Sequence, residues 1–292
     1  MEEGSPVAIS LEPHIVLLGG GYTLQRVGEL LSPDSFVITS RSEETCAEWR
    51  AKGWSAARVS LEEPDTLRAL WTAYPSISTV VDSVPPIRAG GDPARGVSEV
   101  CATLKGTKVS RIIYLSTTGV FGVRDGSHVS ESSPAKPWNA QGEARLQCEQ
   151  VYRSSGISVT SLRLPAIYGP DRGLHISIKN GSYKMVGKGE SWSNRIHVED
   201  LATAIVQACQ VPHLPEVLCV SDDCPARSRD VVEYVCTQMG VPMPASVSEQ
   251  DLLAVGAYTM LSNQRVQNML MKKVLSLELK YPSYKEGFGL AP

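Results

Sequence analysis

Three consecutive glycines, Gly19-Gly20-Gly21, follow a short apolar run and precede a segment with helical periodicity. Glycine lets the backbone turn tightly and approach a bound group, and the free N–H groups of a helix start attract phosphates. In this setting the turn predicts a pyrophosphate site for a dinucleotide, with Gly19 and Gly21 in the first two positions of the glycine fingerprint. Leu24 occupies the third position, which predicts a slightly displaced helix or a compensating gap opposite it.

The end of the next strand indicates which dinucleotide is bound. Sites for NAD usually carry an acidic residue here for the ribose 2′-hydroxyl, whereas an arginine suits a 2′-phosphate. This strand ends in Ser40-Arg41-Ser42, and the first carboxylate is Glu43. A guanidinium pairs with phosphate through charge-assisted hydrogen bonds, and the flanking hydroxyls can add to them. We therefore expect NADP(H), with NADPH preferred over NADH and Ser40, Arg41 and Ser42 as ligands.

These residues must be positioned by strands and helices that alternate along the chain. The pattern predicts helices over 24–31, 64–74, 96–104 and 144–154, and strands over 14–18, 36–39, 54–61, 79–84, 111–116 and 158–164. This order predicts an α/β fold, a Rossmann-type doubly wound parallel sheet with a smaller C-terminal substrate lobe.

The same pattern suggests three segments. Residues 1–13, with two prolines, are expected to form a flexible N-terminal extension. Residues 14–165 are expected to form the dinucleotide-binding domain. Residues 166–292 are expected to form mainly the substrate-binding lobe, with some segments returning to the sheet.

Composition limits the classes of protein that remain. The 28 basic and 31 acidic residues give a net charge of −3, which implies no large basic field for nucleic acid. No targeting peptide and no long apolar span are recognisable, so we expect neither secretion nor membrane insertion. The seven cysteines show no CxxC or Cys/His ligand spacing, so we expect free thiols in a reducing cytoplasm and no metal site.

Four motifs carry a resemblance to a known family: Tyr114–Gly122, Arg163–Pro170, Asn194–Ala202 and Tyr281–Gly287. Together they resemble the extended and atypical short-chain dehydrogenase/reductase superfamily, in its NAD(P)-dependent epimerase/dehydratase-like, or sugar-nucleotide-epimerase-like, branch. The resemblance covers nearly the whole chain. It implies the Rossmann fold, whereas function stays open because this superfamily hosts many chemistries.

The resemblance also implies catalytic positions. The family uses a tyrosine as proton donor, a lysine four residues later, and a serine or threonine on the fifth strand. Thr117 matches the strand hydroxyl, but Gln141 stands in the tyrosine position and Arg145 in the lysine position. A glutamine amide can orient a carbonyl yet cannot transfer a proton at neutral pH, while the protonated Arg145 can still anchor ribose hydroxyls. Tyr168 is an alternative proton donor, and His197 is another candidate that is more often structural in such a helix-start pattern.

Further contacts complete the expected site. Substrate anions are assigned to Arg172 and Arg195. A nucleotide sugar is disfavoured, because Ala166 and Ser193 replace the asparagine and arginine that sugar-nucleotide enzymes of the family use. The remaining expected cofactor-binding residues are Tyr22, Thr23, Ser83, Val84, Ser116 and Pro165.

Two functions follow from the sequence. The first is an NADP(H)-dependent oxidoreductase, epimerase or dehydratase that acts on a small metabolite with a non-standard proton donor. The second is a dinucleotide-binding sensor or assembly protein without catalysis. The intact cofactor unit fits both, and the loss of the tyrosine favours the second. The irregular region from Gly169 to Gly189 favours the enzyme, because a pure binder needs no elaborate pocket. The chain is expected to be a monomer or a homodimer.

Overall fold

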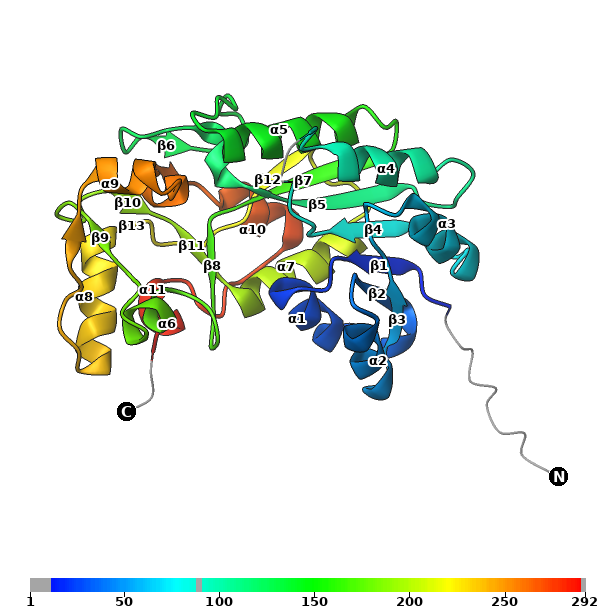
Figure 1. Cartoon of the computed structure of the whole chain (residues 1–292), viewed down its shortest axis with the longest axis horizontal. Helices are drawn as coiled ribbons and strands as arrows, with labels where there is room; N and C mark the ends of the chain where they lie inside the picture. The colour runs from blue at the N-terminus through cyan, green and yellow to red at the C-terminus, as the bar shows by residue number, and fades with distance from the viewer. Residues whose placement is uncertain (1–11, 88–90, 290–292) are drawn as a thin grey trace.

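The centre of the molecule is a sheet of seven parallel strands in the order β12-β7-β5-β4-β1-β2-β3 (Figure 1). The structure, a computed structural model, describes residues 12–87 and 91–289. The extension expected for residues 1–13 therefore lies almost entirely outside the described residues. The strands are β1 Ile15–Leu18, β2 Phe36–Ser40, β3 Ser55–Arg58, β4 Thr79–Asp82, β5 Arg111–Thr117, β7 Ser158–Leu164 and β12 Val217–Cys219.

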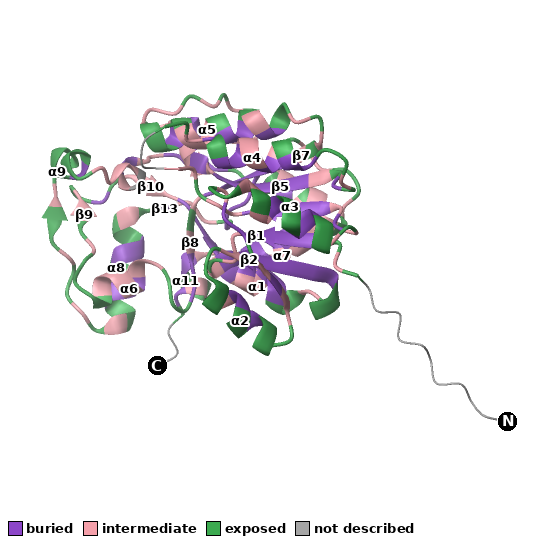
Figure 2. Ribbon diagram, turned by 45° about the vertical axis from the view of Figure 1, so that its right-hand side comes forward, coloured by how far each residue is buried: buried purple, intermediate pink, exposed green. Residues whose placement is uncertain are grey.

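Helices cover both faces of this sheet, as their apolar residues require. On one face, Leu24 and Leu201 are fully buried with the strand residue Leu17. On the other face, Leu67 and Val100 are fully buried with Val16. The first face carries α1 Tyr22–Leu30, α2 Glu43–Ala51, α7 Val198–Gln210 and α10 Met269–Leu275, and the second carries α3 Pro64–Ala73, α4 Arg95–Thr103 and α5 Ala140–Arg153. Figure 2 shows the strands buried between helices whose outer surfaces are exposed. The expected Rossmann-type fold is thus confirmed.

The second lobe is built from short two-stranded ladders and small helices, on the left of Figure 1. Its own apolar cluster includes Tyr168, Val235 and Phe288. The ladders pair β8 Ala166–Tyr168 with β11 Arg195–His197, β10 Trp192–Ser193 with β13 Ala226–Arg227, and β9 Met185–Val186 with β14 Ser246–Val247. Beside them lie β6 His128–Val129 paired with β15 Arg265–Val266, and the helices α6 Leu174–Lys179, α8 Ser228–Met239, α9 Glu249–Ala254 and α11 Tyr284–Gly287.

Some element boundaries differ from the expected ones for local reasons. Helix α5 begins at Ala140 and not at residue 144, because the Asn139 side chain caps it by accepting the Gly142 N–H at 3.0 Å. Helix α2, which the pattern did not indicate, begins where Ser42 accepts the Thr45 N–H at 3.2 Å. Strand β3 covers only Ser55–Arg58 of the expected 54–61.

Helix α1 accommodates a leucine at position 24 because its close approach to the sheet occurs at another residue. Leu24 is fully buried in the core. The close approach between helix and strand occurs one turn later, at Gly28, where a Cβ atom would lie 3.1 Å from both Phe36 and Trp54. Gly19 has a φ of 82°, a backbone conformation that favours glycine.

Candidate functional site

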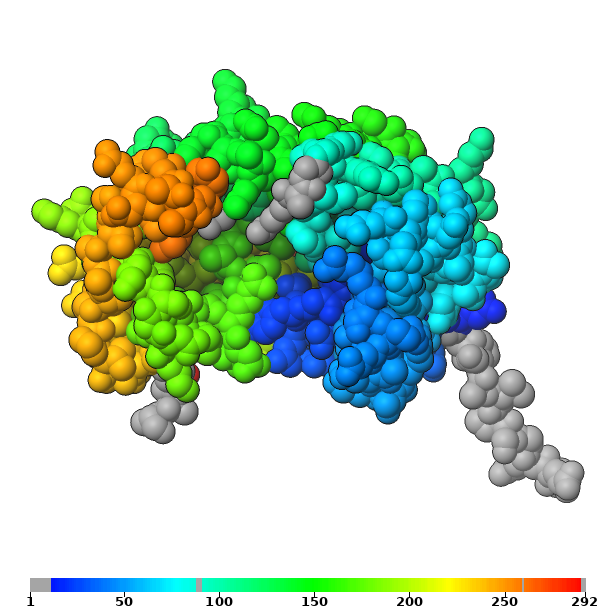
Figure 3. All heavy atoms as spheres, in the orientation of Figure 1, coloured from blue at the N-terminus to red at the C-terminus, as the bar shows by residue number. Residues whose placement is uncertain are grey.

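A pocket of about 1000 Å³ lies between the sheet and the second lobe. Its walls come from the carboxyl ends of β4 and β5, the start of α1, the first turns of α5, and the ladders of the second lobe. Figure 3 shows the molecular surface hollowed between these parts. The pocket lies where the strand order reverses between β1 and β4, the position at which open α/β sheets usually bind ligands.

The start of α1 forms one wall of the pocket through Gly21, Tyr22 and Thr23. Gly21 is the N-cap and provides no side-chain hydrogen bond to the helix. A Cβ atom added at Gly21 would meet only the Gly19 carbonyl, at 4.0 Å, so the space in front of it is open. The N–H groups of a first helical turn have no intrahelical partner, and this open turn therefore suits an anion.

The end of β4 is held tightly against the glycine turn. The Ser83 hydroxyl donates to the Gly19 carbonyl at 2.6 Å, and Ser83 lines the pocket. A Cβ atom added at Gly19 would lie only 2.8 Å from the Val84 Cγ2 atom. The Val84 N–H donates to the Asp82 carboxylate at 2.7 Å. The structure thus brings Ser83 and Val84 beside Gly19, as their expected roles require.

The residues after β2 lie at the exposed edge of this end of the sheet. Arg41 is exposed, while the Ser42 N–H donates to the Ser40 hydroxyl oxygen at 3.1 Å. The Ser42 hydroxyl oxygen caps α2. The parallel register of β2 and β3 also places Arg58 opposite Ser40, which the sequence did not indicate. Arg58 is itself paired with Glu63 at 2.7 Å.

The end of β5 and the start of α5 bring the expected catalytic residues together. Thr117 and Gln141 both line the pocket. The Thr117 hydroxyl oxygen accepts the Gly119 N–H at 3.1 Å. Close contact between the two elements depends on Gly142, where a Cβ atom would lie 2.9 Å from the Gly119 carbonyl oxygen.

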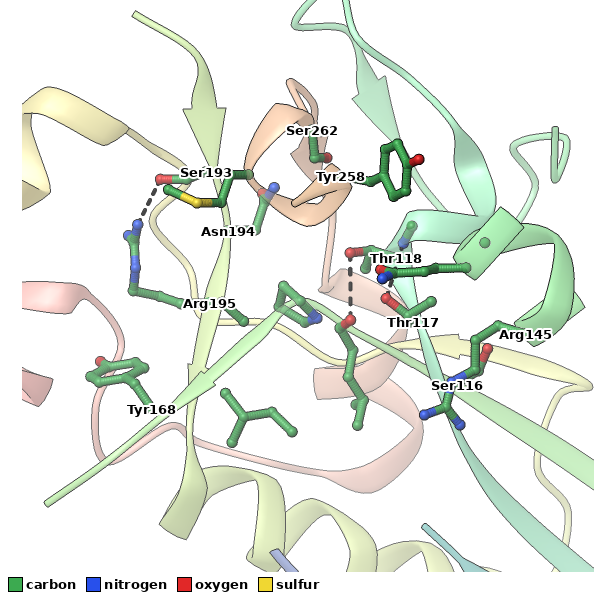
Figure 4. Close-up of a pocket in the computed structure, with 18 of the residues that line it drawn as sticks. Ser116, Thr117, Thr118, Arg145, Tyr168, Ser193, Asn194, Arg195, Tyr258 and Ser262 are labelled. Carbon is green, nitrogen blue, oxygen red and sulfur yellow. Dashed lines mark hydrogen bonds between the residues drawn. The ribbon is translucent and has the colours of Figure 1, made fainter. Parts of the chain in front are cut away.

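Arg145 lines the same pocket (Figure 4), but its side chain is hydrogen-bonded to the protein. Its Nη1 atom donates to the Tyr114 hydroxyl at 2.9 Å, to the Leu115 carbonyl at 3.1 Å and to the Val84 carbonyl at 3.4 Å. These bonds tie α5 to the ends of β4 and β5. Arg145 therefore braces the strand ends, in addition to any contact with a ribose.

Two buried polar networks lie behind this wall, and the sequence analysis missed both. Tyr152 donates to the Asp82 carboxylate at 2.6 Å, and burial raises the pKa of Asp82 to about 6. The hydroxyl of Ser116, an expected cofactor ligand, donates to Glu149 at 2.5 Å. Glu149 in turn pairs with Arg163 at 2.8 Å, with side-chain exposures of 0% and 4%. Only the tertiary structure reveals these pairs, because their members lie on different elements.

The environments of Tyr168 and His197 favour structural roles for both. The Tyr168 ring is 2% exposed and stacks on Phe288 with a centroid distance of 4.4 Å. Its hydroxyl donates to the Ser283 carbonyl at 3.4 Å, and burial raises its pKa. The His197 Nδ1 atom accepts the Glu199 N–H at 3.3 Å and caps α7, while burial lowers the pKa of His197 to about 4. Proton transfer by Tyr168 is therefore disfavoured by its surroundings.

The structure separates the two arginines expected to bind substrate. Arg172 is exposed, and its guanidinium lies 5.6 Å from the ring centroid of Tyr22, at the α1 wall. Arg195 is buried on β11 in the second lobe. Pro165, an expected cofactor contact, lines the pocket between β7 and β8.

Two aromatic residues that the sequence analysis missed also line the pocket, namely Trp138 and Tyr258. Their rings pack edge to face with a centroid distance of 5.7 Å. Trp138 directly precedes the N-cap of α5, so Tyr258 is brought to the end of the pocket that contains Gln141. Figure 4 shows Tyr258 on the side of Thr117 and Thr118, far from Tyr168. The position of Trp138 just before a helix start was the available signal.

The described ranges contain no cluster of His, Cys, Asp or Glu side chains suited to a metal ion. Within the same ranges, no helix is both long and apolar enough to cross a membrane.

Comparisons with known proteins show what the chain is similar to. Residues 85–218 match the model of the NAD dependent epimerase/dehydratase family. Protein YeeZ of Escherichia coli strain K12 is 27% identical over 219 residues, which cover 72% of this chain and 70% of YeeZ. The "Epimerase family protein SDR39U1 homolog, chloroplastic" of Arabidopsis thaliana is 24% identical over 184 residues, 60% of this chain and 52% of that protein.

Two solved structures show how far the fold is shared. A functionally unknown conserved protein from Silicibacter pomeroyi superposes with a TM-score of 0.76 and 29% identity, covering 94% of this chain and 96% of that one. WbmG of Bordetella bronchiseptica, solved in complex with NAD, superposes with a TM-score of 0.77 and 17% identity, covering 97% and 94%. The chain thus has a Rossmann-type α/β fold, and its residues 85–218 are similar to the NAD dependent epimerase/dehydratase family. It is a relative of the NAD-dependent epimerase/dehydratase proteins, which confirms the resemblance carried by its motifs.

Proposed function

We propose that the chain is an enzyme that binds NADP(H) and acts on a small metabolite as an oxidoreductase, epimerase or dehydratase. The observation that carries this proposal is the open first turn of α1, at Gly21 to Thr23, facing a pocket that also contains Thr117 and Gln141. The pyrophosphate would lie on the free N–H groups of that turn. Ser83, Val84, Ser116 and Pro165 would surround the rest of the dinucleotide.

Recognition of a 2′-phosphate is assigned to Arg41 with Ser40 and Ser42. The exposed guanidinium of Arg41 follows β2 directly, the position where dinucleotide-binding sheets read the ribose. A bound nicotinamide would supply or accept a hydride. The residues of the chain would orient the reacting carbonyl, through the hydroxyl of Thr117 and the amide of Gln141.

The proton in this proposal is exchanged with the hydroxyl of Tyr258. Gln141 cannot perform that step, and the hydroxyl of Tyr168 is held by Ser283 at a distant wall. Tyr258 comes to the α5 end of the pocket through its contact with Trp138. A phenol can act as a general acid when it reaches the reacting oxygen.

The alternative is a dinucleotide sensor or assembly protein without catalysis. The inward hydrogen bonds of Arg145 favour it, because this guanidinium braces the strand ends in place of tuning a tyrosine. Both functions require the same dinucleotide site. They differ in turnover, because the enzyme converts a substrate and the sensor does not.

Calorimetric titration with NADPH and NADH tests the shared part of both functions. We expect NADPH to bind at least tenfold more tightly, and Arg41→Ala to remove this preference while leaving NADH affinity unchanged, as the loss of a charge-assisted bond requires. Arg68→Ala removes another exposed arginine, on α3, and serves as the matched control. Equal affinities of the original chain for the two cofactors would contradict the NADP(H) assignment.

A further inference from the structure

The pocket carries charge of only one sign. Among its described lining residues are three arginines, Arg145, Arg172 and Arg195, and no aspartate, glutamate, lysine or histidine. A cavity lined by one sign of charge concentrates ligands of the opposite sign. The occupants of this pocket are therefore expected to be anions.

The three arginines do not compete for the same anion. Arg172 lies beside the Tyr22 ring, at the wall assigned to the dinucleotide. Arg145 donates to protein acceptors. Arg195 lies on β11, which pairs with β8, and Figure 4 shows it on the opposite side of the view from Arg145. It is the cation left for a second anionic ligand.

The guanidinium of Arg195 is buried and only partly satisfied. The residue is 7% exposed, and its Nη2 atom donates to the Ser193 hydroxyl oxygen at 2.7 Å (Figure 4). The Ser193 hydroxyl donates to the Ala226 carbonyl at 3.1 Å, which fixes its orientation. The Nη1 atom of Arg195 is buried and has no partner among the described residues. A buried donor without an acceptor is costly, so an acceptor from a ligand would be strongly favoured.

The neighbouring carboxyl group does not fully neutralise this cation. The negative charge of Asp222 acts on Arg195, but among the described residues the Nη1 atom of Arg195 and the Oδ2 atom of Asp222 are each without a hydrogen-bond partner. The Oδ1 atom of Asp222 accepts the Cys224 N–H at 3.2 Å, and its Oδ2 atom has no partner. Burial raises the pKa of Asp222 to about 7, so its negative charge is incomplete at neutral pH.

The donors around Arg195 suit a small anion of single charge. Tyr183 lines the same pocket, and it is close enough for the positive charge of Arg195 to lower the pKa of its hydroxyl, against the larger effect of burial, which raises it. Val231 and Phe288 also line the pocket, and they pack in one apolar cluster with Tyr284, whose ring centroid lies 5.5 Å from the Arg195 guanidinium. One guanidinium and one neutral phenol match a carboxylate, whereas a phosphate monoester brings a charge of about −2 near neutral pH.

We propose that Arg195 and Tyr183 bind the carboxylate of the substrate, so that the metabolite is a small carboxylic acid with an apolar portion. This inference rests on the proposed function, since it places the acid in the same pocket as the dinucleotide. Binding of the acid can nevertheless be measured without turnover.

The test is calorimetric titration with straight-chain carboxylates from propanoate to octanoate, their primary amides, and butyl phosphate. We expect at least one acid to bind tenfold or more tightly than its amide. Arg195→Gln should remove this preference, and Arg195→Lys should retain part of it. Tyr183→Phe should weaken acid binding about threefold to tenfold, the loss of one hydrogen bond. The exposed Arg68→Gln serves as a control and should bind like the original chain.

Each sample is also titrated with NADPH, which separates the two proposals. NADPH binding without any acid binding that depends on Arg195 would overturn the carboxylate site and leave the proposed function standing. Equal binding of acids and amides would also overturn the carboxylate site. Tighter binding of butyl phosphate than of every acid would contradict the assignment of a carboxylate as the bound anion. If Arg195→Gln fails to fold, Tyr183→Phe and Arg195→Lys decide the question.

Discussion

At one end of the pocket the groups offered to a ligand are the backbone N–H groups of Tyr22 and Thr23, since the Gly21 N–H already donates to the Gly19 carbonyl at 2.7 Å. At the other end they are buried side chains led by Arg195. The first end depends on a turn and a helix that are adjacent in sequence. The second depends on β11, β13 and loops that meet only in the folded lobe. A site made of backbone N–H groups can be retained while the catalytic side chains beside it are replaced. A site made of side chains is altered by a single substitution.

The largest expected effect is on kcat, and it distinguishes Tyr258 from Tyr168 as the proton donor. With the first substrate that is turned over, Tyr258→Phe should lower kcat by about 10²- to 10⁴-fold, the usual contribution of a general acid. Tyr168→Phe should change kcat less than about threefold, because its hydroxyl is bonded to Ser283. Steady-state kinetics of both variants provide the measurement. The reverse order of effects would reassign the proton to Tyr168.

The next effect concerns the α5 wall of the pocket, behind which the buried pair of Glu149 and Arg163 lies. Glu149→Ala should lower the free energy of unfolding by about 3–5 kcal/mol, because it leaves a buried guanidinium without its partner. Gln150→Ala changes an exposed residue on the same helix and should cost less than about 0.5 kcal/mol. Urea denaturation of the two variants supplies the comparison. A loss below 1 kcal/mol for Glu149→Ala would mean that this pair does not support the wall.

A smaller effect should appear in the pH dependence of stability. The pKa of Asp82 is about 6 in the fold and 3.8 in its ordinary state, so its protonated form is favoured by folding. The stabilisation is complete below pH 3.8 and is lost as the pH rises through 6. Relative to Asp82→Asn, the original chain should lose about 2 kcal/mol between pH 4 and pH 7.

Denaturation of both proteins across this pH range provides the measurement. The comparison with Asp82→Asn removes the parallel contribution of Asp222 and the opposite one of His197, whose pKa is lowered. A difference that stays constant from pH 4 to pH 8 would show that burial does not perturb Asp82.

The sequence predicted the parts of the molecule that depend on local order. Strands such as Ile15–Leu18 and Ser158–Leu164 are short apolar or alternating runs, and the glycine turn follows directly from the first of them. Helix α2 escaped notice because only two of its residues, Cys46 and Trp49, are buried. Its start was nevertheless marked by Ser42 followed by acidic residues.

Contacts between distant segments could not be predicted in this way. Arg145 donates to Tyr114 on another element, and Tyr258 meets Trp138 across a long stretch of sequence. The sequence placed Tyr168 near the cofactor, and in the fold its ring packs against Phe288, a residue distant in the sequence. Spacing along the chain carries no information about such pairs. The resemblance supplied the positions of Thr117 and Gln141, and the fold brings them to one pocket.

The central claim is that the open first turn of α1 holds the phosphates of a dinucleotide, and Gly21→Asp tests it most directly. Gly21 has a φ of −78°, which any residue adopts, and aspartate is a favourable N-cap, so the fold should keep or gain stability. The new carboxylate would occupy the open space and repel phosphate. We expect the Kd for NADPH to rise at least 100-fold at an unchanged or higher Tm, with Ser32→Asp at the N-cap of a distant 3₁₀ turn as the control. NADPH affinity equal to that of the original chain would contradict the account.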